Sequence, residues 1–292
     1  MKVPESIQRV VARVLGWAPV AMGRRVMDRF GLAGGGLLAG GLTYAALFAL
    51  LPALLLLTGV LGFLVDDDDR RRAIVEGIGE SLPPLEGFLA ASLEQITEGA
   101  AGAGTIGLIG LAWGASRFYG SLDDAFGRIF HSAPQRSFVA RTIRGILSVV
   151  LLLTVFLSAL ILTGIASFLA QETASRFGAD TRMFWGIVTP LMTLGVFVGG
   201  MALIYKVVPA RNVPWRTLLL PAVVVGTLLT VLTQLFSYIA PRLIGAAALY
   251  GTFAAIFAAM VWLSFGFQLM LIGASWLRER LGPLPVEPTE DA

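Results

Sequence analysis

The feature that most constrains this chain is a set of long apolar stretches that carry almost no charge. Six such stretches lie at residues 37–65, 105–122, 145–170, 183–205, 217–240 and 249–277. Uncharged apolar stretches of about 18 residues or more are typical of transmembrane helices, because about 20 helical residues cross the hydrocarbon core of a bilayer. The sequence therefore predicts an all-α, polytopic membrane helical bundle with six transmembrane helices.

Composition supports this class and argues against several kinds of chemistry. Only 14% of the residues are charged, whereas soluble domains carry about 25%. The chain has no cysteine, one histidine (His131) and two lysines, so the usual material for zinc sites and nucleotide-binding loops is missing. The stretch GAGTIG at 102–107 has the glycine spacing of a dinucleotide site but lacks the preceding strand. We therefore expect no enzymatic activity, no catalytic residue, no metal and no cofactor.

Basic residues are distributed unequally between the two sides of the predicted bundle. The N-terminal arm, residues 123–144, residues 206–216 and the residues after the sixth span hold 6, 4, 3 and 2 arginines and lysines, whereas the opposite loops hold 3, 2 and 1. Loops rich in arginine and lysine stay in the cytoplasm. Both termini are therefore predicted to be cytoplasmic.

Residues 1–31 form a basic, amphipathic arm. Apolar residues recur at the spacing of one helical face from Ile7 to Leu15, with arginines opposite. A helix of this kind lies on the membrane surface with its arginines at anionic lipid headgroups. The expected partners of the arm are therefore the lipid bilayer and these headgroups, and not nucleic acid.

The predicted transmembrane domain covers residues 32–280 and is interrupted by one long loop. This loop, at 66–103, contains two short amphipathic patterns around Pro83 and is rich in glutamate. We expect it to form short extracytoplasmic helices, because it lies on the side poor in basic residues. Residues 281–292 are predicted to form a polar cytoplasmic tail.

Ionisable residues are nearly absent from the predicted spans. None of the six apolar cores contains aspartate or glutamate, the usual carriers of protons and coupling ions inside membranes. Arg117, in the second span, is the one basic residue. Two interpretations stay open for it: its long side chain reaches the inner interface, or its charge faces a central cavity and binds a phosphate or carboxylate group.

Five uncharged residues complete the candidates for a cavity or substrate path. Pro52 predicts a kink or a tilt in the first span, which is longer than a bilayer requires. Tyr44 and Gln268 are expected inside the bundle, since lipid exposure of such groups is unfavourable. Thr43 and Gln234 are further polar candidates. Each polar group in this set alternatively serves a hydrogen bond between helices.

Three G-x-x-x-G motifs overlap the predicted spans, at residues 36–40, 110–114 and 195–199. In membranes this spacing allows two helix backbones to approach closely, because glycine has no side chain to separate them. We interpret the three motifs as sites of packing within the bundle. Homodimerisation through one of them is the alternative.

Several ordered segments together resemble one bacterial family. They are GLTYAALFALLPALLLLTGVLG at 41–62, GTIGLIGLAWGASRFYGSLDDAFGRIF at 104–130, VPWRTLLLPAVVVGTLLTVLTQLFSYIAP at 213–241 and LYGTFAAIFAAMVWLSFGFQLMLIGASW at 249–276. Over roughly residues 31–280 the chain resembles the YihY/BrkB family of bacterial inner-membrane proteins, once mislabelled ribonuclease BN. The resemblance implies a six-span protein of the bacterial inner membrane.

This chain differs from the family at one position, and one activity once assigned to the family is not expected here. The last span of the family typically ends in Gly-Ala-Glu, whereas this chain has Gly273, Ala274 and Ser275, so a mechanism that relies on the glutamate is in doubt here. The ribonuclease label is not carried over. A nuclease acting on a large polyanion would need metal ligands and a substantial cytoplasmic surface, and the predicted cytoplasmic loops are short.

Two functional hypotheses follow. The first is a transporter or exporter that moves a small organic solute or a lipid through a central cavity, opened by the kinked first span. The alternative is a non-transporting membrane scaffold that assembles partners through the glycine motifs and the basic arm. A water-accessible polar cavity favours the first hypothesis, and a fully packed apolar bundle favours the second.

Overall fold

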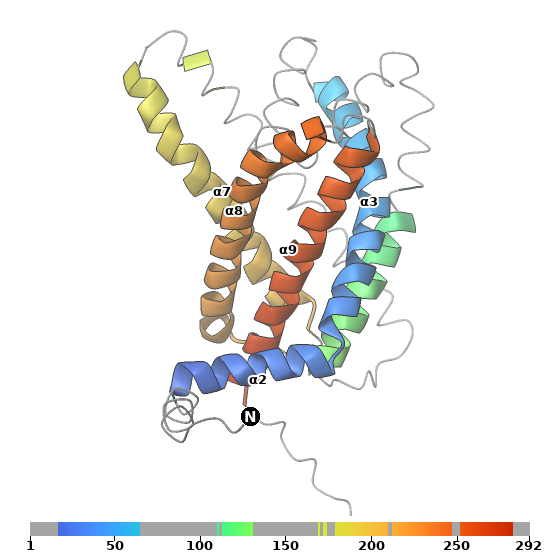
Figure 1. Cartoon of the computed structure of the whole chain (residues 1–292), viewed down its shortest axis with the longest axis vertical. Coiled ribbons are helices and arrows are strands. Elements are labelled where there is room, and N and C mark those ends of the chain that lie inside the picture. The colour runs from blue at the N-terminus through green and yellow to red at the C-terminus, as the bar shows by residue number, and fades with distance from the viewer. Residues whose placement is uncertain are drawn as a thin grey trace, which may run out of the picture.

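The computed structural model describes residues 17–64, 110, 113–130, 169, 172–173, 179–209, 212–246 and 252–282. This part of the chain is helical and contains no strand, which confirms the all-helical class. The labelled helices are α2 (Ala18–Leu32), α3 (Gly35–Leu64), α7 (Ala179–Val207), α8 (Trp215–Ala246) and α9 (Thr252–Arg280) (Figure 1). Residues 113–130 form a further helix.

Four predicted spans agree with observed helices to within a few residues. The first, fourth, fifth and sixth spans correspond to α3, α7, α8 and α9. Each of these helices contains a long apolar run without charged residues. Inside a membrane, every backbone N–H group of such a run must pair within the helix. The third span, at 145–170, lies outside the described residues apart from residue 169.

The second span is part of a longer helix. Residues 113–130 are helical, so this helix extends eight residues past the predicted end of the span at residue 122. The physical reason is that Ala125, Phe126, Ile129 and Phe130 are buried. Their spacing places them on one helical face, which packs against the other helices.

Three of the described helices are long and apolar enough to cross a membrane: Phe184–Val207, Trp215–Ile239 and Ile256–Arg280. The pair formed by α2 and the first part of α3 also passes this test, but it is bent by 62°. The described part of the chain thus contains three candidate spans, or four if the bent pair is one span. The prediction of six spans remains a prediction.

Helix α2 lies across one end of the bundle (Figure 1). Pro19 occupies its first turn, where the missing N–H group is of no consequence. The helix ends before Gly34, whose φ of +71° favours glycine. The next residue, Gly35, lies against the ring of Phe30, so a side chain at position 35 would collide with that ring. The bend between α2 and α3 therefore depends on two consecutive glycines, Gly34 and Gly35.

The hydrophobic core lies near the end of the bundle that carries α2. It is built from the start of α3, the last turns of the 113–130 helix and of α7, the start of α8 and the end of α9. We call this set the basal core; it consists of Ala39, Leu42, Leu122, Ala125, Phe126, Ile129, Phe130, Met201, Ala202, Tyr205, Val208, Val213, Leu218, Ala222, Val225, Leu229, Met270, Leu271, Ala274 and Leu277.

Candidate functional site

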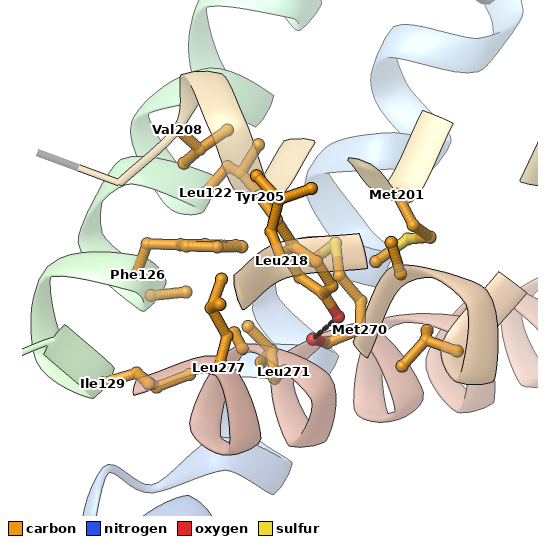
Figure 2. Packing of buried hydrophobic residues seen from close by; sticks show 14 of the residues in the cluster. Leu122, Phe126, Ile129, Met201, Tyr205, Val208, Leu218, Met270, Leu271 and Leu277 are labelled. Atoms are coloured by element: carbon orange, nitrogen blue, oxygen red, sulfur yellow. Dashed lines mark hydrogen bonds between the residues drawn. The ribbon is translucent and has the colours of Figure 1, made fainter. Parts of the chain in front are cut away.

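Tyr205 occupies the centre of the basal core. It is fully buried, and its hydroxyl group donates a hydrogen bond to the backbone oxygen of Met270 over 2.8 Å. Its ring lies 6.3 Å from the ring of Phe126, which is stacked on Phe130 at 6.0 Å. Figure 2 shows Tyr205 pointing at Met270, with Phe126 beside it. One tyrosine thus links α7 to α9 and to the 113–130 helix.

The close approach of α9 to Tyr205 depends on Gly273. A methyl group added there would collide with the hydroxyl oxygen of Tyr205 and lie 2.5 Å from a methyl carbon of Val225. A similar contact joins α7 and α8, because a methyl group at Gly226 would lie 2.8 Å from the backbone nitrogen of Val198. Both glycines are therefore required by helix packing.

An ionic contact fastens α2 to the end of α9. The Nε atom of Arg29 donates to Oε1 of Glu279 over 2.6 Å, and Nε of Arg25 lies 3.7 Å from Oε2 of the same carboxylate. We call these three residues the latch. Arg29 and Glu279 are 250 residues apart along the chain, and their side chains are only 24% and 16% exposed. The latch therefore joins distant segments at the base of the bundle.

A second set of polar contacts closes the connection between α7 and α8. The ammonium group of Lys206 donates to the side-chain oxygen of Asn212 over 2.9 Å and to the backbone oxygen of Val213 over 2.7 Å. It also lies 5.7 Å from the centroid of the Trp215 ring. All these contacts are with residues close to Lys206 in the sequence, and they connect the end of α7 to the start of α8. Lys206 therefore has a structural role here.

The structure does not bring the uncharged candidates together. Thr43 is buried, and its hydroxyl group donates to the backbone oxygen of Ala39 one turn earlier, over 2.8 Å. Gln268 is half-buried and donates to the hydroxyl of Ser264 over 3.4 Å. Gln234 is exposed on α8. Thr43 and Gln268 thus use their hydrogen bonds within their own helices.

Helix α3 is continuous from Gly35 to Leu64 and therefore runs through Pro52. The helix is thus not divided at this proline. The side chains from residue 50 to the end of α3 lie outside the described side chains. The kink predicted at Pro52 remains a prediction.

Tyr44 and Arg117 are exposed where α3 meets the 113–130 helix. Tyr44 is 63% exposed, and its place inside the bundle remains a prediction. Its ring contacts Phe48 at 4.7 Å, and Phe48 contacts Trp113 at 6.4 Å. The guanidinium group of Arg117 lies 5.5 Å from the centroid of the Trp113 ring. We call these four residues the aromatic–arginine strip.

The glycine motifs agree only in part with their interpretation. Gly114 packs tightly, because an added methyl group would lie 2.9 Å from the Cα atom of Ala49 on α3. An added methyl group at Gly36, Gly40, Gly195 or Gly199 would meet no atom of the described residues within 4 Å. The packing glycines Gly226 and Gly273 lie outside the motifs, so motif spacing did not identify them.

Gly199→Ala tests whether the open glycine face of α7 has a partner. If it has none, the substitution is expected to raise the free energy of unfolding by about 0.5–1 kcal/mol, because alanine restricts the unfolded chain and favours the helix. Unfolding of the purified protein in detergent would measure this effect. A clear destabilisation would contradict it and indicate that another segment or a second copy packs on this face.

Comparison with known proteins places the chain in a family. The sequence profile of the family described as Virulence factor BrkB matches residues 26–282. The chain belongs to the BrkB family. The match begins inside α2 and ends just after α9, so it includes the basal core, the aromatic–arginine strip and two of the three latch residues, Arg29 and Glu279.

Similar BrkB-family proteins are named only as membrane proteins. The chain is 26% identical to a UPF0761 membrane protein of Chromohalobacter salexigens, over 88% of this chain and 63% of the relative. It is 27% identical to UPF0761 membrane protein Rru_A2625 of Rhodospirillum rubrum, over 81% and 53%. A relative from Glaesserella parasuis is 28% identical, over 68% and 72%. The chain thus spans between half and two thirds of the first two relatives. No solved structure matches it.

Ser275, where the resemblance predicts a glutamate, lies inside the basal end of α9. Ser275 is fully buried, and its hydroxyl group donates to the backbone oxygen of Leu271 over 2.9 Å. The next turn carries Arg278, which is also buried and donates to the backbone oxygen of Gly282 over 2.6 Å. A serine fits this place because its hydroxyl group is satisfied within its own helix.

Proposed function

We propose that this BrkB-family membrane protein is a transporter or exporter that moves a small organic solute or a lipid across the bacterial inner membrane. The observation that supports this proposal best is the uneven packing of the helices along their length. The described helices converge on the basal core at the α2 end, and the first turns of α7 separate from α8 and α9 toward the other end. A transporter alternates between states open to opposite sides, and a bundle closed at one end matches one such state.

The separation is visible in the side chains and in the backbone. The first turns of α7 lean away from α8 and α9 in Figure 1, and Phe184, Ile187 and Leu191 on this part of α7 are exposed. Helices α8 and α9 remain in contact, since the indole nitrogen of Trp262 donates to the hydroxyl of Thr233 over 3.4 Å. The described helices therefore splay mainly at α7.

The proposal places the closed end in the cytoplasm. Basic residues are concentrated on the side of the predicted termini, and α2 has the position expected of a helix at the inner surface. Transport would then require the basal core to loosen while the latch releases α9 from α2. No catalytic chemistry is assigned to the chain in this proposal.

Reconstitution into sealed liposomes tests the proposal. Labelled phospholipid flipping and release of trapped small solutes would be followed in parallel, with protein-free liposomes as the control. Protein-dependent movement of either cargo is the expected result. No movement of either, in vesicles that contain folded protein, would contradict transport.

The latch gives a sharper prediction for the same assay. Glu279→Gln removes the negative charge that pairs with Arg25 and Arg29. A partly buried ion pair worth about 1 kcal/mol shifts the equilibrium between the open and closed states about fivefold toward the closed state. We therefore expect the variant to move cargo several-fold faster. Arg24→Gln is the matched control, because Arg24 pairs with Asp28 on the exposed side of α2. Equal rates in the two variants would contradict a gating role for the latch.

A membrane scaffold is the second candidate, favoured by the open glycines Gly36, Gly40, Gly195 and Gly199. Because the natural chain has no cysteine, single cysteines can separate the two functions. In a transporter, Gln268→Cys is expected to react with a water-soluble thiol reagent, whereas the outward-facing Val231→Cys is not. No reaction at position 268 in native membranes would favour the scaffold.

A further inference from the structure

We propose that the aromatic–arginine strip binds the anionic phosphate headgroup of a membrane phospholipid. The strip consists of Tyr44 and Phe48 on α3 and of Trp113 and Arg117 on the adjoining helix. Its aromatic rings are all exposed, Trp113 by 56% and Phe48 by 43%, and Arg117 is exposed as well. This inference rests on the proposed transport function and deepens it by naming the class of cargo.

The strip is held together by close backbone packing. Gly114 lies against α3, where an added methyl group would be 2.9 Å from the backbone oxygen of Phe48. This contact fixes Trp113 beside Phe48, and one turn later Arg117 lies over the Trp113 ring. The four side chains therefore form one continuous surface across two helices, which requires little rearrangement to bind a ligand.

The position of Arg117 makes its positive charge significant. Tyr44 lies nine residues into α3, or about 13 Å from the bend at the membrane surface, because a helix rises about 1.5 Å per residue. Gly114 packs on Ala49, 14 residues into α3, and Arg117 follows Gly114 by less than one turn, so Arg117 lies at a similar distance from the bend although the predicted span ends five residues after it. A charged side chain at such depth is unfavourable unless an anion or water accompanies it.

Within the described part of the chain, no carboxylate forms an ion pair with Arg117. Its side chain contacts the face of Trp113, which compensates only part of the charge. A guanidinium group binds phosphate oxygens through two parallel hydrogen bonds, so a phosphate is well matched to it. The ligand expected at Arg117 is therefore an anion of this geometry.

The aromatic side chains select a lipid over a free anion. Tyr44, Phe48 and Trp113 offer an exposed apolar surface next to the charge, and such a surface suits acyl chains or a glycerol backbone. Tyrosine and tryptophan combine an apolar ring with a polar group. Both residues are therefore enriched where lipid headgroups meet acyl chains. A phospholipid supplies both the phosphate and the apolar part, whereas inorganic phosphate supplies only the first.

Native mass spectrometry of the full-length protein tests this inference without measuring transport. The protein would be released from nanodiscs of phosphatidylcholine containing a small fraction of phosphatidylglycerol. We expect the natural chain to retain phosphatidylglycerol in excess, and Arg117→Gln to reduce this enrichment about tenfold, the loss expected for one charge-assisted pair of bonds. Arg117→Lys is expected to keep part of it, because lysine retains the charge but not the planar fork.

Arg242→Gln is the matched control. Arg242 also lies over an exposed ring, that of Tyr238 at 3.6 Å, but it is near the end of α8 that is far from the basal core. This variant is expected to leave the enrichment unchanged. Equal losses in the Arg117 and Arg242 variants would overturn the proposal, because they would indicate a general effect of surface charge.

Two further results would also overturn the inference. One is unchanged enrichment in both Arg117 variants. The other is complete displacement of the lipid by millimolar inorganic phosphate, which would assign the site to a free anion. Lipid enrichment without any movement of cargo in liposomes would leave the binding site intact and contradict only the transport function, so the two failures are distinguishable.

Discussion

Tyr205→Ala is expected to lower the free energy of unfolding by about 3–5 kcal/mol, the range for removing a large aromatic side chain from a core. Tyr205 is fully buried and joins the ends of α7, α9 and the 113–130 helix. Its removal would leave a cavity where several helices meet. Unfolding of the purified protein with increasing denaturing detergent would measure the change.

Tyr205→Phe is the control that separates packing from hydrogen bonding. It keeps the ring and removes only the hydroxyl group that donates to Met270, so a loss of about 1 kcal/mol is expected. If the basal core closes the cytoplasmic end, Tyr205→Ala should also make liposomes leak small solutes more than Tyr205→Phe does. Similar stability of the two variants would contradict a packing role for the ring.

Gly226→Ala has the second largest expected effect. The added methyl group would lie 2.8 Å from both the Cα atom and the backbone nitrogen of Val198 on α7. Backbone atoms cannot move aside as a side chain can, so α7 and α8 must separate. We expect the free energy of unfolding to fall by about 1–3 kcal/mol, as for other overpacked cores.

Gly266→Ala provides the matched comparison for Gly226→Ala. Gly266 lies in the middle of α9, and an added methyl group would be 3.6 Å from a side-chain carbon of Leu229, an ordinary contact. Both substitutions change helix propensity by the same amount, so their difference measures the collision alone. Equal stability of the two variants in detergent would show that α7 and α8 do not pack closely at Gly226.

The sequence by itself was sufficient to locate four of the described helices. The apolar runs that became α3, α7, α8 and α9 are uncharged and of bilayer length, and lipid requires that their backbone groups pair within the helix. This requirement is local, so it can be read from consecutive residues. The same reasoning did not show which residues of the second helix past residue 122 are buried, because burial of Phe126 and Phe130 depends on other helices.

Only the tertiary structure decided which residues act together. The latch joins Arg29 to Glu279 across 250 residues, and no local pattern relates the two positions. The sequence also did not show that Tyr44 is 63% exposed, because the face a helix buries depends on its neighbours.

The same limit applies to the glycines. Every glycine leaves room for a close approach, but of those discussed only Gly35, Gly114, Gly226 and Gly273 lie tightly against another helix. Apolar length specifies a membrane helix because each helix satisfies its own backbone. Contacts between helices are specified by the partner as much as by the residue itself, and the partner is known only once the chain has folded.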